Sequence, residues 1–198
     1  GVRMYHPIST EEVLRENAAY EARINEAEEA LSRRGFPRTA IFRQPVVWGE
    51  HDQYQHVNNA HYIRWFESAR MRWMERMSRT LSPEIASNLV RGRGVGIILA
   101  STYCRYRRPV TYPDTVVIGQ AALPMKFADR VTVRSQAYSV AQSAIVAEAD
   151  FECVAYDYDR LCKASLPPEV ADALRAWTYT GEDKEPYCQK TSRRKTVS

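Results

Sequence analysis

The densest group of reactive side chains lies in residues 51–62. It holds Asp52, His56 and two consecutive amides, Asn58 and Asn59, just before a stretch with helical periodicity. A carboxylate can act as a nucleophile or a base, and an imidazole can carry a proton near neutral pH. The same residue types also cap helices and favour the positive end of a helix dipole. Alone, this segment is therefore consistent with a functional site or with a plain helix start.

Metal chemistry is not predicted. The histidines His51, His56 and His61 recur at intervals of five, which matches neither HxxxH nor HExxH. The four cysteines lie far apart and form no CxxC pair, which favours a reducing compartment. We expect no metal site and no disulfide framework.

A long amphipathic helix is predicted for residues 60–79, which contain no Pro or Gly. Its apolar residues recur at steps of four, three, four and four: Tyr62, Phe66, Ala69, Trp73 and Met77. Glu67 lies at the edge of the apolar arc and Arg70 within it, so their burial would require a mutual ion pair or other polar partners. One side of this helix must be covered.

The elements that would cover it are strands. Runs rich in Val, Ile, Thr and Tyr occupy residues 95–107, 115–123, 130–140 and 144–156, and an earlier strand is predicted for 41–48. The four later runs are joined by short turns, and a parallel crossover needs a dozen or more residues, so these strands are predicted to be antiparallel. A sheet curled around the long helix is the simplest solution, which is an α+β fold.

Two segments flank this unit. A capping-box pattern before residues 11–34 predicts a helical arm, and residues after 180 are polar. We divide the chain into an N-terminal helical extension (1–40), a central domain (41–178) and a polar, flexible tail (179–198).

Composition excludes several classes of function. The chain has 198 residues, 44% hydrophobic and 26% charged, with a net charge of +4 concentrated in the tail, so nucleic-acid binding is not implied. No apolar run approaches the roughly 20 residues that span a bilayer. Glu11, Glu12 and Glu16 lie where a signal peptide would avoid acids. We expect no membrane span and an intracellular location, cytoplasmic or mitochondrial, and not secretion.

One spacing resembles the signature of hotdog-fold thioesterases of the 4-hydroxybenzoyl-CoA thioesterase superfamily: Asp52-x-x-x-His56-Val57-Asn58-Asn59-x-x-Tyr62-x-x-x-x-Glu67-x-x-Arg70. Residues 106–114 and 157–167 resemble the same family in the same order. The resemblance covers about residues 41–178. It implies the hotdog fold, with a curled antiparallel sheet around a central helix, and hydrolysis of an acyl thioester, usually of coenzyme A.

The resemblance also implies residue roles. Asp52 would be the nucleophile or the general base for water, and His56 would orient or relay a proton unless it only makes a structural hydrogen bond. One branch of the superfamily uses a helix Glu instead, which makes Glu67 the alternative catalytic carboxylate. Amides near the helix start would polarise the carbonyl. The substrate-binding residues expected are Tyr54, Asn58, Asn59, Ala60, Tyr62, Arg107 and Arg108.

One departure limits the resemblance. Related plant acyl-carrier-protein thioesterases have an Asn where this chain has Tyr54, so their scheme does not transfer whole. Two other functions therefore stay open: a non-catalytic acyl-CoA-binding protein, and an enoyl-CoA hydratase-like enzyme, although the Asp-x-Asn-x-x-His spacing of the latter is absent.

The expected partner is a small-molecule acyl thioester of lipid metabolism, with coenzyme A present only as part of the substrate and no separate cofactor. An open curled sheet leaves strand edges that a symmetric copy would cover, so a homodimer or a dimer of dimers is expected.

Overall fold

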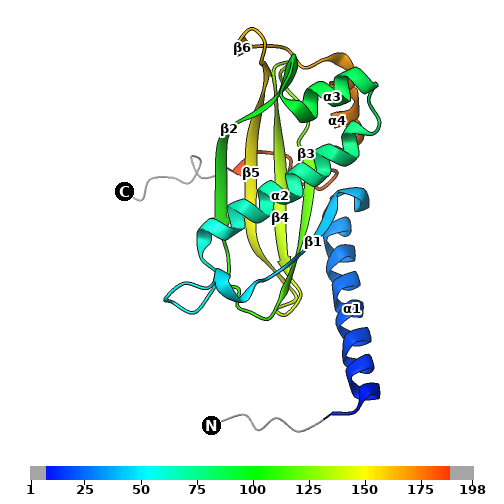
Figure 1. The fold of residues 1–198 in the computed structure, drawn as a ribbon, viewed down its shortest axis with the longest axis vertical. Coiled ribbons are helices and arrows are strands. Elements are labelled where there is room, and N and C mark those ends of the chain that lie inside the picture. Colours follow the sequence, from blue (N-terminus) through cyan, green and yellow to red (C-terminus); the bar gives the residue numbers. More distant parts are fainter. Residues whose placement is uncertain (1–7, 188–198) are drawn as a thin grey trace.

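The computed structural model describes residues 8–187 and contains one antiparallel sheet with a helix packed on each face (Figure 1). The helices are α1 (Thr10–Arg33), α2 (Asn59–Ser78), α3 (Pro83–Arg91) and α4 (Pro168–Ala176). The strands are β1 (Ile41–Pro45), β2 (Val95–Tyr106), β3 (Thr115–Ala122), β4 (Arg130–Ser139), β5 (Ala144–Asp157) and β6 (Cys162–Lys163).

The strand order is β1-β3-β4-β5-β2, and β6 pairs with the end of β5. Every pairing is antiparallel. The predicted α+β hotdog fold is confirmed, with a curled sheet against the long helix α2. The predicted ranges of the main elements differ from the observed ones by a few residues at their ends, and β6 is an addition that the sequence did not signal.

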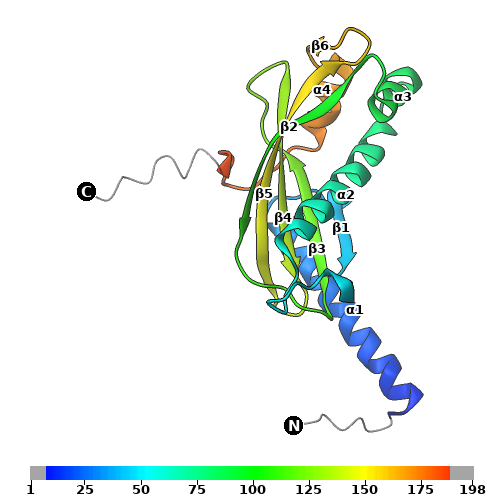
Figure 2. The same cartoon turned by 60° about the vertical axis from the view of Figure 1, so that its left-hand side comes forward.

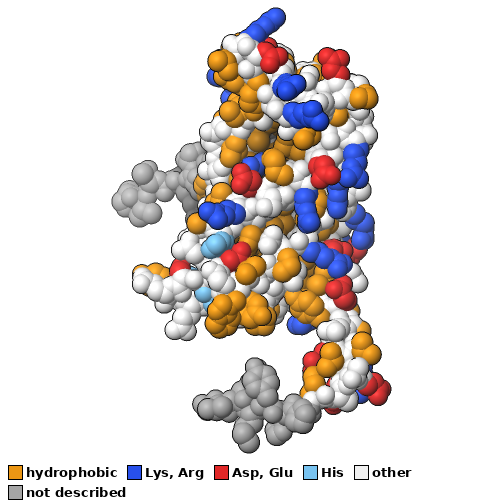
Figure 3. All heavy atoms as spheres, in the orientation of Figure 1, with side chains coloured by type: hydrophobic (Ala, Val, Ile, Leu, Met, Phe, Trp, Pro, Cys, Tyr) orange, Lys and Arg blue, Asp and Glu red, His pale blue; other side chains and the backbone are white. Residues whose placement is uncertain are grey.

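The face of the sheet toward α2 carries the main apolar core. Trp65, Phe66 and Trp73 of α2 are buried, and the Phe66 ring meets the Phe151 ring of β5 edge to face at 5.8 Å. Burial of each such side chain stabilises the fold by about 1.5–3 kcal/mol relative to exposure. Charges of both signs lie over the outer surface of α2 (Figure 3), as expected for its solvent side.

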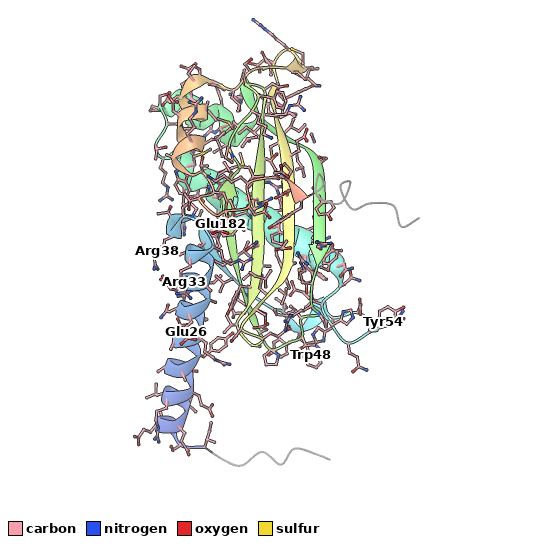
Figure 4. All side chains as sticks on the ribbon, turned by 180° about the vertical axis from the view of Figure 1, so that it is seen from behind. Glu26, Arg33, Arg38, Trp48, Tyr54 and Glu182 are labelled. Atoms are coloured by element: carbon pink, nitrogen blue, oxygen red, sulfur yellow. The ribbon has the colours of Figure 1, made fainter. Side chains whose placement is uncertain are left out.

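Helix α1 covers the opposite face of the sheet (Figures 2 and 4). Its buried residues, Ile24, Ala27 and Leu31, pack in a second core with Val117 and Ala121 of β3. The alternate residues of β3 pack in the α2 core, so all eight residues of this strand are buried. The N-terminal half of α1 is exposed and projects from the sheet.

The first part of the segment predicted to be flexible is packed on the same face as α1. Tyr179 is buried, and its amide donates to the carbonyl of Ala122. Arg134, fully buried, bonds the carboxylate of Asp150 and the main-chain carbonyls of Asp183 and Glu185. Figure 4 shows this segment crossing the sheet near Glu182. The tail predicted to be flexible thus begins with a segment, residues 179–187, that makes packed contacts and supplies acceptors to a buried guanidinium. Residues 188–198 lie outside the described part, and flexibility stays a prediction.

Across residues 8–187, none of the helices combines the length and the apolar character needed to cross a bilayer.

Candidate active site

The site begins with a tight turn between the short helical segment 48–50 and α2. Residues His51 and Val57 form an antiparallel bridge, and the Asp52 amide donates to the His56 carbonyl at 3.1 Å. Val57 is tied to the carbonyl of Val110 at 2.8 Å. These bonds fix the loop against the turn that follows β2.

The carboxylate of Asp52 is partly buried and held at the start of α2. One oxygen accepts the Tyr54 amide at 2.8 Å, and the other accepts the side-chain amide of Asn58 at 3.3 Å. Part of the role of Asp52 is therefore to shape its own turn. The same contacts fix the direction of its carboxylate.

The N-terminus of α2 is capped by Asn58. The side-chain oxygen of Asn58 accepts the backbone amide of Ala60 at 2.9 Å, and the backbone amide of Asn58 donates to the Glu50 carbonyl at 3.0 Å. Among the backbone amides of residues 58–60, that of Asn59 is therefore the one for which the described chain, residues 8–187, provides no acceptor. The sequence predicted a group of free amides near residues 58–60, and the structure narrows that group to Asn59.

A cavity of about 310 Å³ opens beside this amide. It is lined by His56, Val57, Asn59, Tyr62, Tyr106, Arg107, Arg108 and Pro109. Five of the predicted site residues, which belong to segments almost fifty positions apart, therefore meet at one cavity.

Two tyrosines form its wall. The rings of Tyr62 and Tyr106 meet edge to face at 5.3 Å, and the Tyr106 hydroxyl donates to the Asn59 carbonyl at 3.1 Å. Burial raises the pKa of each phenol to about 12, so both stay protonated at neutral pH. Sequence reasoning did not select Tyr106, although this residue opens the 106–114 segment that carried the resemblance.

Other predicted residues lie outside the cavity wall. Asp52, Asn58 and Ala60 are not among the residues that line the cavity. The exposed ring of Tyr54 stacks on His56 with centroids 6.3 Å apart. Figure 4 shows Tyr54 at the tip of the loop. The His56 ring has its Nδ1 3.5 Å from the Val57 carbonyl, a weak contact that leaves the imidazole available to the cavity.

Glu67 and Arg70, which would need each other or other polar partners if both were buried, form no ion pair within the described chain. Glu67 is exposed, whereas Arg70 is 5% exposed and its guanidinium lies 4.7 Å above the Phe151 ring. The Arg70 Nη1 has no hydrogen-bond partner within residues 8–187. The two side chains leave α2 in different directions, one to solvent and one to the core, so the condition for a mutual pair, burial of both, is not met.

The two arginines of the cavity differ in their contacts. Arg107 donates from both Nε and Nη2 to one oxygen, Oε2, of Glu148, whose side chain is nearly buried. Arg108 is exposed, and no ion pair engages it in the part of the chain described. Arg108 is therefore the cation of this cavity that is free to bind an anion.

No cluster of three or more His, Cys, Asp or Glu side chains within residues 8–187 has the arrangement of a metal site.

Comparison with known proteins places this geometry in a family. The family model described as "Thioesterase-like superfamily" matches residues 46–174. A curated protein of Aquifex aeolicus (strain VF5), named "Putative esterase", is 24% identical over 135 residues, which cover 68% of this chain and 97% of the relative.

Solved structures share the fold. The PA5185 protein from Pseudomonas aeruginosa strain PAO1 superposes with a TM-score of 0.60 at 22% identity, over 72% of this chain and 93% of that one. Slr0204, a 1,4-dihydroxy-2-naphthoyl-CoA thioesterase from Synechocystis, gives a TM-score of 0.58 at 16% identity, over 68% and 94%.

The chain belongs to the thioesterase-like superfamily. Membership supports hydrolase activity on a thioester as the general class of function.

Proposed function

We propose that the protein hydrolyses an acyl-CoA thioester to the free acid and coenzyme A, with Asp52 as the catalytic carboxylate. The observation that carries the proposal is the pairing of two features at the start of α2. Asn58 holds the Asp52 carboxylate, and the neighbouring Asn59, whose amide has no acceptor in the described part of the chain, lines a cavity.

The reaction needs an electrophilic carbon and a stabilised oxyanion. The substrate carbonyl oxygen accepts the Asn59 amide at the positive end of the helix, where developing negative charge is favoured. Asp52 then acts in one of two ways. As a base it takes a proton from water while the hydroxide oxygen bonds to the carbonyl carbon; as a nucleophile its own oxygen forms that bond, giving a mixed anhydride that water cleaves. In both routes the carbon–sulfur bond breaks and coenzyme A leaves as the thiolate.

The phosphates of coenzyme A are proposed to bind Arg108, the cation of this cavity that has no ion pair within the described chain. A guanidinium suits phosphate because it presents several donors in a fixed plane. We assign this role to Arg108 and give Arg107 the structural role of holding Glu148. His56, which lines the cavity and whose carbonyl accepts the Asp52 amide, is proposed to orient the attacking water.

We further propose that the working unit is a homodimer joined through β2. Among the described residues this strand pairs only with β5, along one of its two edges, and it exposes Ile98 and Leu99, at 39% and 41%. A long edge with exposed apolar residues is a template for pairing with a second copy. Such pairing would bring the partner close to Tyr106 at the end of the same strand.

Thiol release from a panel of acyl-CoA esters tests the activity. Asp52→Asn should lower kcat at least 100-fold, because the amide can neither attack nor accept a proton, while circular dichroism and the unfolding midpoint stay close to wild type. Glu67→Gln is the matched control on the neighbouring helix and should keep its rate.

Three results would contradict the assignment. If Glu67→Gln is inactive and Asp52→Asn is active, the helix carboxylate is the catalyst. If no ester is cleaved yet acyl-CoA binds, the protein is a non-catalytic binder. If enoyl-CoA is consumed with no release of thiol, the protein is a hydratase.

A further inference from the structure

A second and larger cavity lies on the face of the sheet opposite α2. Its volume is about 510 Å³, within the usual range for small-molecule sites. Side chains of β2, β4 and β5 form its floor, the loop between β3 and β4 forms one wall, and the C-terminal segment forms another through Lys184 and Pro186. Figure 4 shows the sheet from this side.

The charges of this cavity leave a positive balance. The carboxylate of Asp150 is bonded by Arg134 at 3.1 Å, and that of Glu152 by Arg130 at 3.2 Å. Two further lining cations, Lys126 and Lys184, have no ion pair within residues 8–187. Asp150 is neutralised by Arg134, whereas Arg130 is shared between Glu152 and the nearer carboxylate of Asp129, at 2.9 Å. The two ammonium groups are therefore the cations available to a ligand.

The lining also offers apolar surface. Leu123 is buried against the sheet, while Phe127 is 62% exposed and lies beneath the guanidinium of Arg130 at 5.4 Å. Met125 and Pro124 complete the wall between them. A large apolar ring left open beside a cavity is suited to the apolar part of a ligand.

The wall that carries Lys184 is fixed in place. Arg134, with no exposed surface, bonds the carbonyls of Asp183 and Glu185, the residues on either side of Lys184. The amide of Tyr187 also donates to Asp150 at 2.6 Å. The position of Lys184 is thus set by a buried guanidinium, although its own side chain is exposed.

We propose that this cavity binds an organic monoanion with an apolar body, such as a medium-length carboxylate, at a site separate from the candidate active site. The apolar body would lie on Phe127 and Met125, and the carboxylate would bind Lys126 and Lys184. Coenzyme A is a poorer fit, because its several phosphate charges would face only two unpaired cations, with Glu152 close by. The proposal does not rest on the hydrolase activity, and β2 pairing with a second copy would use main-chain groups in the plane of the sheet rather than this face.

Titration calorimetry of the full chain with sodium decanoate tests the site. The double variant Lys126→Ala/Lys184→Ala should weaken decanoate binding about tenfold or more, as expected for the loss of charge-assisted contacts. Phe127→Ser should weaken it several-fold through the apolar contact. Arg108→Ala, which removes the cation of the first cavity, is the matched control and should leave decanoate affinity unchanged.

Absence of decanoate binding overturns the proposal. So does a loss of decanoate affinity in Arg108→Ala that the double lysine variant does not share, because the ligand would then occupy the first cavity. A parallel titration with coenzyme A should show no dependence on the two lysines; if it does, the cavity is a nucleotide site.

Discussion

The two cavities lie on opposite faces of one sheet and are built in different ways. The first is formed by two short segments, 56–62 and 106–109, and its polar group at the helix start is a main-chain amide. The second is assembled from β2, β4, β5, one loop and the C-terminal segment, and its available charges are side-chain ammonium groups. A site that depends on a helix terminus leaves a compact signature in the sequence. A site assembled by tertiary packing leaves none.

The largest expected effect concerns the buried arginine behind the second cavity. Arg134→Met leaves the Asp150 carboxylate buried without its cation, so the free energy of unfolding should fall by about 3–5 kcal/mol. Urea unfolding measures this loss. Decanoate affinity should fall with it, whereas thiol release, measured where the variant is folded, should persist.

The control for this experiment removes both charges. Arg134→Met/Asp150→Leu should recover a large part of the lost stability, since no uncompensated charge remains. A single variant as stable as wild type would show that Arg134 does not organise the second cavity.

The two arginines of the first cavity separate binding from stability. Arg108→Ala should raise KM for acyl-CoA about tenfold and leave kcat nearly unchanged, because it removes a contact made equally in the ground and transition states. Arg107→Ala should instead lower stability, because it leaves the nearly buried Glu148 carboxylate without its cation and with only the hydrogen bond from Gln136. Steady-state kinetics and urea unfolding of both variants check the contrast, and equal KM values for the two would refute it.

Removal of the N-cap of α2 should have a smaller effect, and it should lower both the stability and kcat. Asn58→Ala loses the bond to the Ala60 amide, which costs about 1 kcal/mol of stability, and it also frees the Asp52 carboxylate, so kcat should fall. Ser9→Ala removes the equivalent cap of α1, far from both cavities, and should leave kcat at the wild-type value. An unchanged kcat in Asn58→Ala would contradict the positioning role.

Alkaline titration, taken at pH 10, gives the smallest effect. The pKa of Tyr62 is raised to about 12 in the folded chain from the ordinary value near 10, so the unfolded chain ionises first. The stabilisation is complete below pH 10, falls by about 0.4 kcal/mol at pH 10, and declines further as the pH rises toward 12. Unfolding curves against pH measure it, and Tyr62→Phe should show a shallower decline; an identical decline would mean that other groups cause it.

Much of the fold follows from local patterns. Apolar spacing gave α2, and strand runs with short turns gave β2 to β5 in antiparallel order, because these signals depend on neighbours in sequence. The position of α1 on the sheet could not be predicted from sequence. Its apolar stripe of Ile24, Ala27 and Leu31 indicates that one face of the helix is buried, but it does not identify the element that buries it. The packed contacts of residues 179–187 could not be predicted for a related reason. Arg134, which bonds two carbonyls of this segment, is almost fifty residues away in sequence.

The sequence predicted several residues of the candidate site, but it did not predict the contacts between them. Five predicted residues line the first cavity, but only coordinates show that Asn58 occupies the Ala60 amide and leaves that of Asn59 free. The sequence also does not show that Arg107 is paired and Arg108 is not, because this difference depends on Glu148 in the neighbouring strand β5.

The double coverage of β3 has a consequence for how the molecule opens. Its amide hydrogens lie between two apolar cores, so their exchange with solvent deuterium should require unfolding of the whole domain. The edge strand β2 is bonded on one side only, so its free amides can exchange through local opening. Both cavities border β2, so each lies beside the part of the sheet where local opening is expected to cost the least free energy. The central strand β3 is expected to open only when the whole domain unfolds.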